Sequence, residues 1–260
     1  MPVYFVIAKS VVTLAWAGAL SLLERLRPAS PRPPRTNAPR LVHNLGLWLT
    51  TVALSPLLTA PITVLATQSD LWSRPAAAPG DWMMNALAAA GTFLLLDLWV
   101  YLWHRASHEW PLLWRFHEIH HRDAFLDTSS GVRFHPGEVA LSALARAPLL
   151  IAFDVPLTSV FAYDAIVTLA ALFHHSNVRL PARAEAMVRH VFVTPSHHWV
   201  HHHAVRADTD SNYATVLTLW DRLLGSWSPT QRTLDMTIGA ENAPDLPLAR
   251  LVLQPFLRRA

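Results

Sequence analysis

The chain has 260 residues, of which 52% are hydrophobic and only 15% are charged, with a formal net charge of +3. Soluble domains carry about 25% charged residues, so this composition indicates a membrane protein. The absence of cysteine excludes disulfides, thiolate zinc sites and iron–sulfur clusters, and it leaves nitrogen and oxygen as metal ligands. No basic run is interleaved with aromatic residues, so we expect no nucleic-acid partner.

The N-terminal part of the chain predicts two membrane spans joined by a basic loop. Residues 3–23 match the length of about 20 residues that crosses a bilayer. We expect a retained helix and not a cleaved signal peptide, because a basic start and a small-residue cleavage site are missing. Residues 24–40 carry five arginines and five prolines, which predicts a cytoplasmic loop. Residues 41–67 predict a second span, which Pro56 and Pro61 should kink.

The next apolar segments bring the chain back to the cytoplasmic side. Residues 68–81 carry more acidic than basic side chains, which suits the outer side, and residues 82–103 predict a third span. Residues 139–173 are apolar but interrupted by prolines, so either a helical hairpin or one span with an interfacial helix would fit. We favour the hairpin, because the arginines that follow it predict that residues 174–260 are cytoplasmic.

These segments predict a single all-α domain over residues 1–260. It would consist of about four transmembrane helices, surrounded by membrane lipid, with a cytoplasmic helical cap that carries the histidines. Residues 1–81 would supply the N-terminal spans and the proline- and arginine-rich loop. The richness in arginine, alanine and proline hints at a GC-rich bacterial genome. We therefore expect a multi-pass protein of the bacterial inner membrane with its active site on the cytoplasmic side.

The histidines are concentrated in a few clusters. Residues 103–122 contain HxxxH followed by HxxHH, and a second HxxHH begins at His198. Residues three or four apart share a helical face, so each motif should aim its imidazoles at one point. Imidazole suits iron, zinc, copper and nickel, and the count exceeds the four ligands of a tetrahedral ion, so we expect two metal ions. The clustered histidines are His104, His108, His117, His120, His121, His174, His175, His198, His201 and His202, and isolated His135 is an additional candidate.

Asp97 is an ionisable residue inside the expected third span. It precedes His104 by seven residues and lies close to the same helical face. An ionisable group in a span is a functional candidate by default. The preferred role is a hydrogen bond that orients a metal-bound histidine, and the alternative is a hydrogen bond between helices.

Six segments resemble the sterol desaturase/fatty acid hydroxylase superfamily of membrane di-iron enzymes. They are DLWVYLWHRASH (97–108), PLLWRFHEIHH (111–121), VRFHPGE (132–138), HSNVRLP (175–181), TPSHHWVHH (194–202) and NYATVLTLWDRLLGSW (212–227). The resemblance implies a helical membrane fold with a catalytic core at about residues 90–230. It also implies that the block from Asn212 to Arg222 is structural and fastens the cap near the metals.

The same resemblance implies the chemistry. Two iron ions with O2 as co-substrate would attack an unactivated C–H bond of a sterol-like or fatty acyl lipid, by hydroxylation or desaturation. It ranks His175 above His174 and leaves His135 less secure. The implied catalytic metal ligands are His104, His108, His117, His120, His121, His175, His198, His201 and His202.

Electrons for such a reaction must come from outside the chain. The sequence has no nucleotide-binding glycine motif, no haem signature and no cysteine cluster. The implied partners are an NAD(P)H-dependent reductase and a ferredoxin or cytochrome b5-like carrier that docks on the basic cytoplasmic face.

Two other classes stay open. A histidine-rich metal transport or binding protein without redox catalysis is one, although transport favours ionisable groups at mid-membrane and these histidines cluster at the cytoplasmic ends of the spans. The other is an inactive relative that binds metal or lipid, although no histidine of the core motifs is missing.

Overall fold

The computed structural model describes residues 3–31, 37–69, 71, 73 and 80–257. The residues it leaves out include parts of the arginine-rich loop and of the expected outer loop, so those two predictions lie partly outside the described residues. The described segments form helices, and β-structure in them is limited to isolated bridges. The predicted all-α fold is confirmed.

Among the residues that the structure describes, four helices are long and apolar enough to cross a membrane. They are α1 (Val3–Leu26), α2 (Asn37–Leu58), α4 (Trp82–Glu109) and α7 (Leu157–His175). Only 6% of the residues in the most apolar stretch of α1 are buried within the protein. This helix therefore presents leucine, valine and phenylalanine side chains to its surroundings. Such a surface is stable in lipid and unstable in water. The four long helices confirm the expected multi-pass membrane protein.

The second predicted span is divided in two. Helix α2 ends at Leu58, and α3 (Ala60–Thr67) begins after Thr59. Pro61 lies in the first turn of α3. Backbone N–H groups at this position have no partner within the helix, so a proline, which lacks the N–H, is tolerated there. Helix α3 then packs against α6 (Pro136–Ala152), and α2 packs against α6 as well. The break between α2 and α3 thus lies between Pro56 and Pro61, where the sequence predicted a kink.

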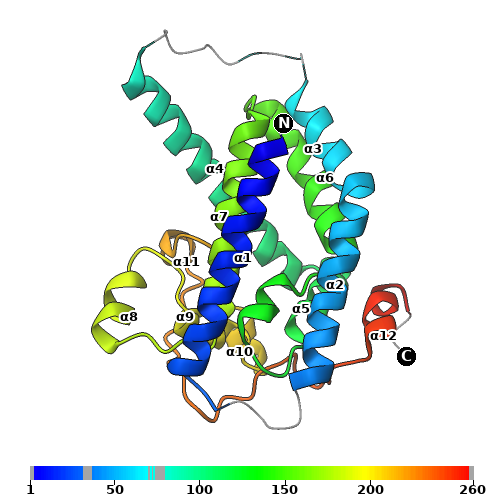
Figure 1. Ribbon diagram of the computed structural model, residues 1–260, viewed down its shortest axis with the longest axis vertical. Helices are drawn as coiled ribbons and strands as arrows, with labels where there is room; N and C mark the ends of the chain where they lie inside the picture. The colour runs from blue at the N-terminus through cyan, green and yellow to red at the C-terminus, as the bar shows by residue number, and fades with distance from the viewer. Residues whose placement is uncertain (1–2, 32–36, 70, 72, 74–79, 258–260) are drawn as a thin grey trace.

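Residues 139–173 form the favoured helical hairpin, with the chain turning between α6 and α7. Figure 1 shows α6 beside α2 and α3, whereas α7 lies beside α1. Asp154 in the turn has a positive φ of 43°, and Pro156 precedes α7. Arg146 of α6 forms an ion pair with Asp164 of α7 at 2.8 Å, which links the two arms. The hairpin returns the chain to the end of the bundle where α4 ends.

Short helices gather at that end and form the cap (Figure 1). Pro111 starts α5 immediately after α4, and the residue before a proline is pushed out of the helical conformation. The chain therefore bends at Trp110, and α5 packs back against α4. The cap helices are α5 (Pro111–His121), η1 (Thr128–Val132), α8 (Ala182–Val188), α9 (Pro195–His201), α10 (Arg206–Thr209), α11 (Leu219–Leu223), α12 (Leu248–Leu253) and η2 (Gln254–Phe256).

Candidate metal centre

All nine histidines that the sequence ranked as ligands come together in the structure. They form two groups whose candidate ligand atoms lie within 4.8 Å of one another inside each group. His121 of one group stacks on His202 of the other with ring centroids 4.2 Å apart, so the two groups adjoin. The five-histidine group is His104, His108, His117, His121 and His201, and the four-histidine group is His120, His175, His198 and His202.

The HxxHH motif of α5 divides its histidines between the two groups. His117 and His121, four residues apart, belong to the five-histidine group, whereas His120 belongs to the four-histidine group. The rings of the adjacent residues His120 and His121 are perpendicular, at 90°. The expectation that one motif aims at one point is therefore wrong, because neighbours in sequence project about 100° apart around a helix.

The HxxHH motif at α9 makes the reciprocal division. His198 and His202 belong to the four-histidine group, and His201 joins the five-histidine group. The rings of His201 and His202 lie at 87° to each other. Each motif thus contributes a pair to one group and a single imidazole to the other, so each complete group draws on both halves of the chain.

Hydrogen bonds on the outer side of four rings determine which nitrogen faces the centre of each group. The Nδ1 atoms of His104, His120, His175 and His201 lie 2.6–3.1 Å from backbone carbonyl oxygens of Tyr213, Arg133, Ala171 and Ser211. A carbonyl oxygen can only accept, so each Nδ1 carries the proton and donates. Each Nε2 is then left with a lone pair that points into its group.

These lone pairs face one another at short distances. In the four-histidine group, Nε2 of His120 lies 2.9 Å from Nε2 of His175. In the five-histidine group, Nε2 of His104 lies 3.1 Å from Nε2 of His117, whose Nδ1 lies 2.7 Å from Glu138. Two lone pairs repel unless a cation lies between them. Metal–nitrogen bonds of about 2.0–2.1 Å at roughly right-angled to tetrahedral geometry separate two ligand nitrogens by roughly 3 Å, so both groups fit a metal ion.

Burial of the imidazoles supports the same assignment. Both ring nitrogens of His108 and of His121 are buried without a hydrogen-bond partner among the described residues. A buried polar atom without a partner destabilises a fold, and a metal ion would satisfy it. Burial, reinforced by the neighbouring histidines, lowers the pKa of His121, His201 and His202 well below the usual histidine value. These side chains are therefore neutral at pH 7, which is the form that binds metal.

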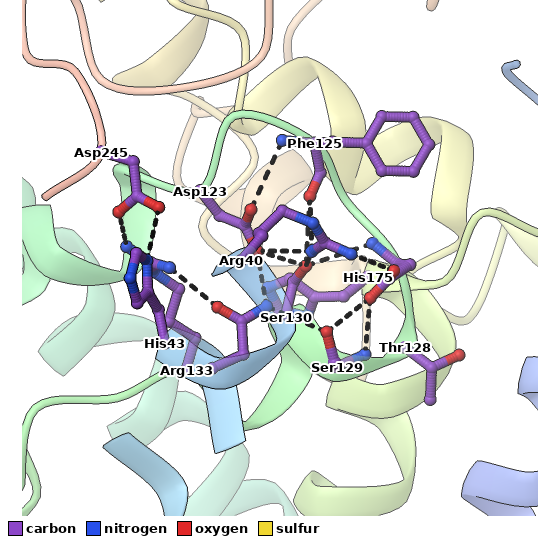
Figure 2. A network of polar contacts seen from close by, with 12 residues as sticks. Arg40, His43, Asp123, Phe125, Thr128, Ser129, Ser130, Arg133, His175 and Asp245 are labelled. Carbon is purple, nitrogen blue, oxygen red and sulfur yellow. Dashed lines mark hydrogen bonds and ion pairs between the residues drawn. The ribbon is translucent and has the colours of Figure 1, made fainter. Parts of the chain in front are cut away.

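A polar network fixes the backbone that orients His120 (Figure 2). Arg133, which is fully buried, donates to the carbonyl of Ile119 at 2.8 Å and to Asn44 of α2 at 2.8 Å, and it pairs with Asp245. The carbonyl of the same Arg133 accepts from Nδ1 of His120. The position of the His120 imidazole is therefore coupled to α2 and to the C-terminal segment.

Arg40 anchors the other end of this network. Figure 2 shows its guanidinium between Asp123 and the carbonyl of Phe125, each at 3.0 Å, and it also pairs with Asp127. Asn44, one turn further along α2, donates to Asp123 at 2.9 Å. The chain that leaves α5 after the last histidine is thus bound tightly to the start of α2.

Two carboxylates beside the groups were not singled out from the sequence. Glu138 of α6 accepts from Nδ1 of His117 at 2.7 Å, and Asp210 lies 3.4 Å from Nδ1 of His108. Glu138 lies in the segment VRFHPGE, three residues after the candidate ligand His135. That spacing was the feature of the sequence that could have indicated a role for this carboxylate. Glu138 thus forms a hydrogen bond to the five-histidine group, whereas Asp210 lies near it without one.

His135 and His174 lie outside both groups. Nδ1 of His135 accepts from the N–H of Gly137, which caps α6, and Nε2 lies 3.0 Å from the carbonyl of Val252. Both nitrogens are in use, so the prediction of His135 as an additional ligand is wrong. His174 packs on His198 with ring centroids 4.1 Å apart, and the ranking of His175 above it agrees with the grouping.

Asp97 does not contact a histidine in the described structure, so its preferred role is wrong. It accepts hydrogen bonds from Tyr163 of α7 at 2.8 Å, from Nε1 of Trp220 at 2.8 Å and from the N–H of Leu217 at 3.3 Å. The alternative role, a hydrogen bond between helices, is the one that the structure shows. A histidine seven residues away on α4 is about two turns along the helix, beyond the reach of a short aspartate side chain.

The block around α11 fastens the cap as expected. Asp221 is fully buried and accepts from the N–H of Ala214, from Ser226 and, at 3.2 Å, from Nε2 of His197. The adjacent Tyr213 supplies the carbonyl that holds His104.

A helical membrane bundle that ends in two adjoining all-histidine groups defines a class of membrane proteins built to hold metal. The chain belongs to the fatty acid hydroxylase family, whose sequence model matches residues 89–226. This agrees with the resemblance seen in the sequence to the sterol desaturase/fatty acid hydroxylase superfamily.

Several named proteins are similar to this chain. Ornithine lipid hydroxylase OlsE of Rhizobium tropici is 27% identical over 96% of this chain and 76% of its own length. Alkylglycerol monooxygenase of Danio rerio is 34% identical over 53% of this chain, which corresponds to 30% of its own length. Cholesterol 25-hydroxylase-like protein of Danio rerio is 29% identical over 53% of this chain and 54% of its own length. No solved structure matches the chain significantly.

Proposed function

We propose that this protein is a membrane-bound di-iron oxygenase that hydroxylates an alkyl C–H position of a lipid. The observation that carries the proposal is the pair of adjoining groups of buried or partly buried imidazoles, one with five and one with four. Membership of the fatty acid hydroxylase family supports the reaction, and relatives named as lipid hydroxylases and monooxygenases support a lipid substrate. These names favour hydroxylation over desaturation. The catalytic core would extend over about residues 90–230.

The proposed reaction balances as follows. One atom of O2 enters the C–H bond to give an alcohol, and the other atom leaves as water, with two electrons and two protons taken up. Two bound iron ions would supply the oxygen-activating chemistry that amino-acid side chains lack. The electrons would come from an NAD(P)H-dependent reductase through a ferredoxin or cytochrome b5-like carrier.

The protein's own contribution is to position the ligands and exclude water. Backbone carbonyls and Glu138 hold five of the nine imidazoles with Nε2 facing inward, so these five need little reorganisation when metal binds. All nine histidines are buried except His104, which is partly buried. A site that excludes water protects a strong oxidant from wasteful side reactions.

We also propose that the site faces the cytoplasm of a bacterial cell. The metal centre lies at the end of the bundle where α1 ends and α2 begins, and this end carries Arg25, Arg27 and Arg40. Arginines beside the ends of spans favour the cytoplasmic side. A carrier in the cytoplasm could then deliver electrons to the cap.

Two alanine variants and one control test the metal assignment. His120→Ala removes a ligand of the four-histidine group, and His201→Ala removes a ligand of the five-histidine group. The control is His190→Ala, because His190 is exposed and lies outside both groups. Full-length protein purified anaerobically should hold two irons per chain in the wild type and the control. Both ligand variants should hold less.

Lipid mass spectrometry of cells that express each variant under labelled O2 tests the reaction. Wild type and the control should produce a lipid that gains one labelled oxygen atom, and the two ligand variants should not. A wild-type protein that binds no more than one metal per chain would contradict the di-iron proposal. Full metal content with unchanged lipids would favour the metal-binding or transport alternative.

A further inference from the structure

One side of the cap exposes a set of apolar side chains outside the metal centre. Met187 is 75% exposed and Leu223 is 65% exposed, and the others are also open to the surroundings. Proteins rarely leave a contiguous apolar surface uncovered unless a partner or a membrane covers it. This apolar patch consists of Met187, Val191, Phe192, Leu219, Leu223 and Leu224.

The patch is continuous although its residues come from two segments. Phe192, shortly after α8, forms an antiparallel bridge with Leu217, shortly before α11. Arg222 of α11 donates to the carbonyl of His190 at 2.8 Å. Figure 1 shows α8 and α11 on the same side of the cap, away from α12. The segments around α8 and α11 therefore present one surface.

The position of Asp97 places α11 at a depth inside the membrane-spanning part of α4. Trp220 and Leu217, at α11, both donate to Asp97. Asp97 lies within the span Trp82–Glu109, seven residues before His104, which corresponds to roughly 10 Å along a helix. The start of α11 thus lies beside α4 on the side of the metal centre that is nearer the membrane interior.

The exposed face of α4 continues into the same surface. Leu94 and Leu102 of α4 are 40% and 45% exposed, and Leu98 lies between them on the same face. Leu98 packs in a cluster that includes Trp220 of α11. The exposed apolar face of α4 is therefore joined to α11 by an apolar contact, that of Leu98 and Trp220 in one cluster.

Arginines border the patch. Arg183, Arg189 and Arg222 are exposed in and after α8 and in α11. Apolar side chains bordered by arginines are typical of segments that lie in the interface of a bilayer, where the guanidinium groups reach lipid phosphates.

We propose that this patch is embedded in the membrane interface and that lipid of the same leaflet covers it. The cap is then partly sunk into the bilayer through α8 and α11, and it is not wholly a cytoplasmic cover. Lipid is favoured over a protein partner because the patch adjoins a spanning helix at a depth that bilayer occupies. This inference does not depend on the reaction proposed above.

Because the chain contains no cysteine, an introduced cysteine is the only thiol to which a spin label can attach. Met187→Cys, Phe192→Cys and Leu223→Cys would each be made in the full chain, spin-labelled and placed in nanodiscs that contain phosphatidylglycerol. Leu94→Cys serves as the reference for lipid. Leu234→Cys, 71% exposed in the cap outside the patch, serves as the reference for water. Collision of each label with O2 and with a water-soluble nickel chelate is then measured.

The three patch labels should collide with the chelate severalfold less than the label at Leu234 and should resemble the label at Leu94. Labels that collide with the chelate as freely as at Leu234 would overturn the proposal. Protection that appears only with two copies per disc, or only after a carrier protein is added, would also overturn it and would indicate a protein interface. The readout needs no lipid oxidation, so its failure is distinguishable from failure of the proposed function.

Discussion

Glu138 accepts a hydrogen bond from Nδ1 of His117 at 2.7 Å, and this contact joins α6 to α5 at the metal centre. Both side chains are buried. The Nδ1 atoms of His104, His120 and His175 donate to neutral backbone carbonyls instead. A carboxylate is a stronger acceptor than a carbonyl and makes the opposite ring nitrogen a better donor to metal. The five-histidine group thus contains a candidate ligand, His117, of a different electronic character.

Replacing this carboxylate should weaken metal binding without unfolding the protein. Glu138→Gln keeps the shape and one acceptor oxygen but removes the charge. Changes of this kind typically cost about 10–100-fold in metal affinity or activity. Iron titration of full-length protein, together with the absorption spectrum of the loaded centre, measures the effect. Glu109→Gln is the control, because Glu109 pairs with Arg105 on the exposed surface. An iron affinity equal to that of the wild type in Glu138→Gln would contradict the role.

Replacement of His135 separates a helix cap from a metal ligand. His135→Ala removes the acceptor for the N–H of Gly137, and loss of an N-cap costs about 0.5–2 kcal/mol of folding stability. Metal content should be unchanged, whereas His175→Ala should reduce it. Thermal unfolding and iron analysis of both variants give the two readouts. A loss of iron in His135→Ala comparable to that in His175→Ala would restore His135 as a ligand.

Asp97 should act on stability and not on the metal. Asp97→Ala leaves the donors of Tyr163, Trp220 and Leu217 without their acceptor. A buried donor left without an acceptor costs about 1–3 kcal/mol. The temperature of unfolding in detergent should therefore fall. The folded fraction should keep its full iron content, and a selective loss of iron at normal stability would show that Asp97 acts on the centre.

Acid should destabilise the metal-free protein. Burial lowers the pKa of His121 and of His202, so the folded chain leaves them neutral where the unfolded chain, with a pKa near about 6.5, binds protons. The unfolded state then holds more protons, and the free energy of unfolding falls as pH drops below about 6.5. Each such histidine contributes up to about 1.4 kcal/mol per pH unit. Unfolding temperatures of chelator-treated protein between about pH 7.5 and 5.5 provide the measurement, and a flat profile would contradict it.

Much of this protein could be predicted from sequence because its constraints are local. The thickness of a bilayer sets the length of an apolar span, so α1, α4 and α7 follow from hydropathy. The nine ligand candidates follow from the repeated spacing of the histidines and from the family resemblance. The block around Asp221 was also identified as structural.

Only the tertiary structure decided how the histidines are shared. Helical spacing shows that His117 and His121 lie on one face, but it does not show that His201 approaches that face from α9. For the same reason, the sequence did not identify the contact of Glu138 and led to a wrong preferred role for Asp97. Both side chains form hydrogen bonds with residues on other helices. The motif from His104 to His121 is thus part of both groups. Ring contacts of His120 and His121 with His201 and His202 bring the two motifs together, and such contacts join residues that lie far apart in the chain.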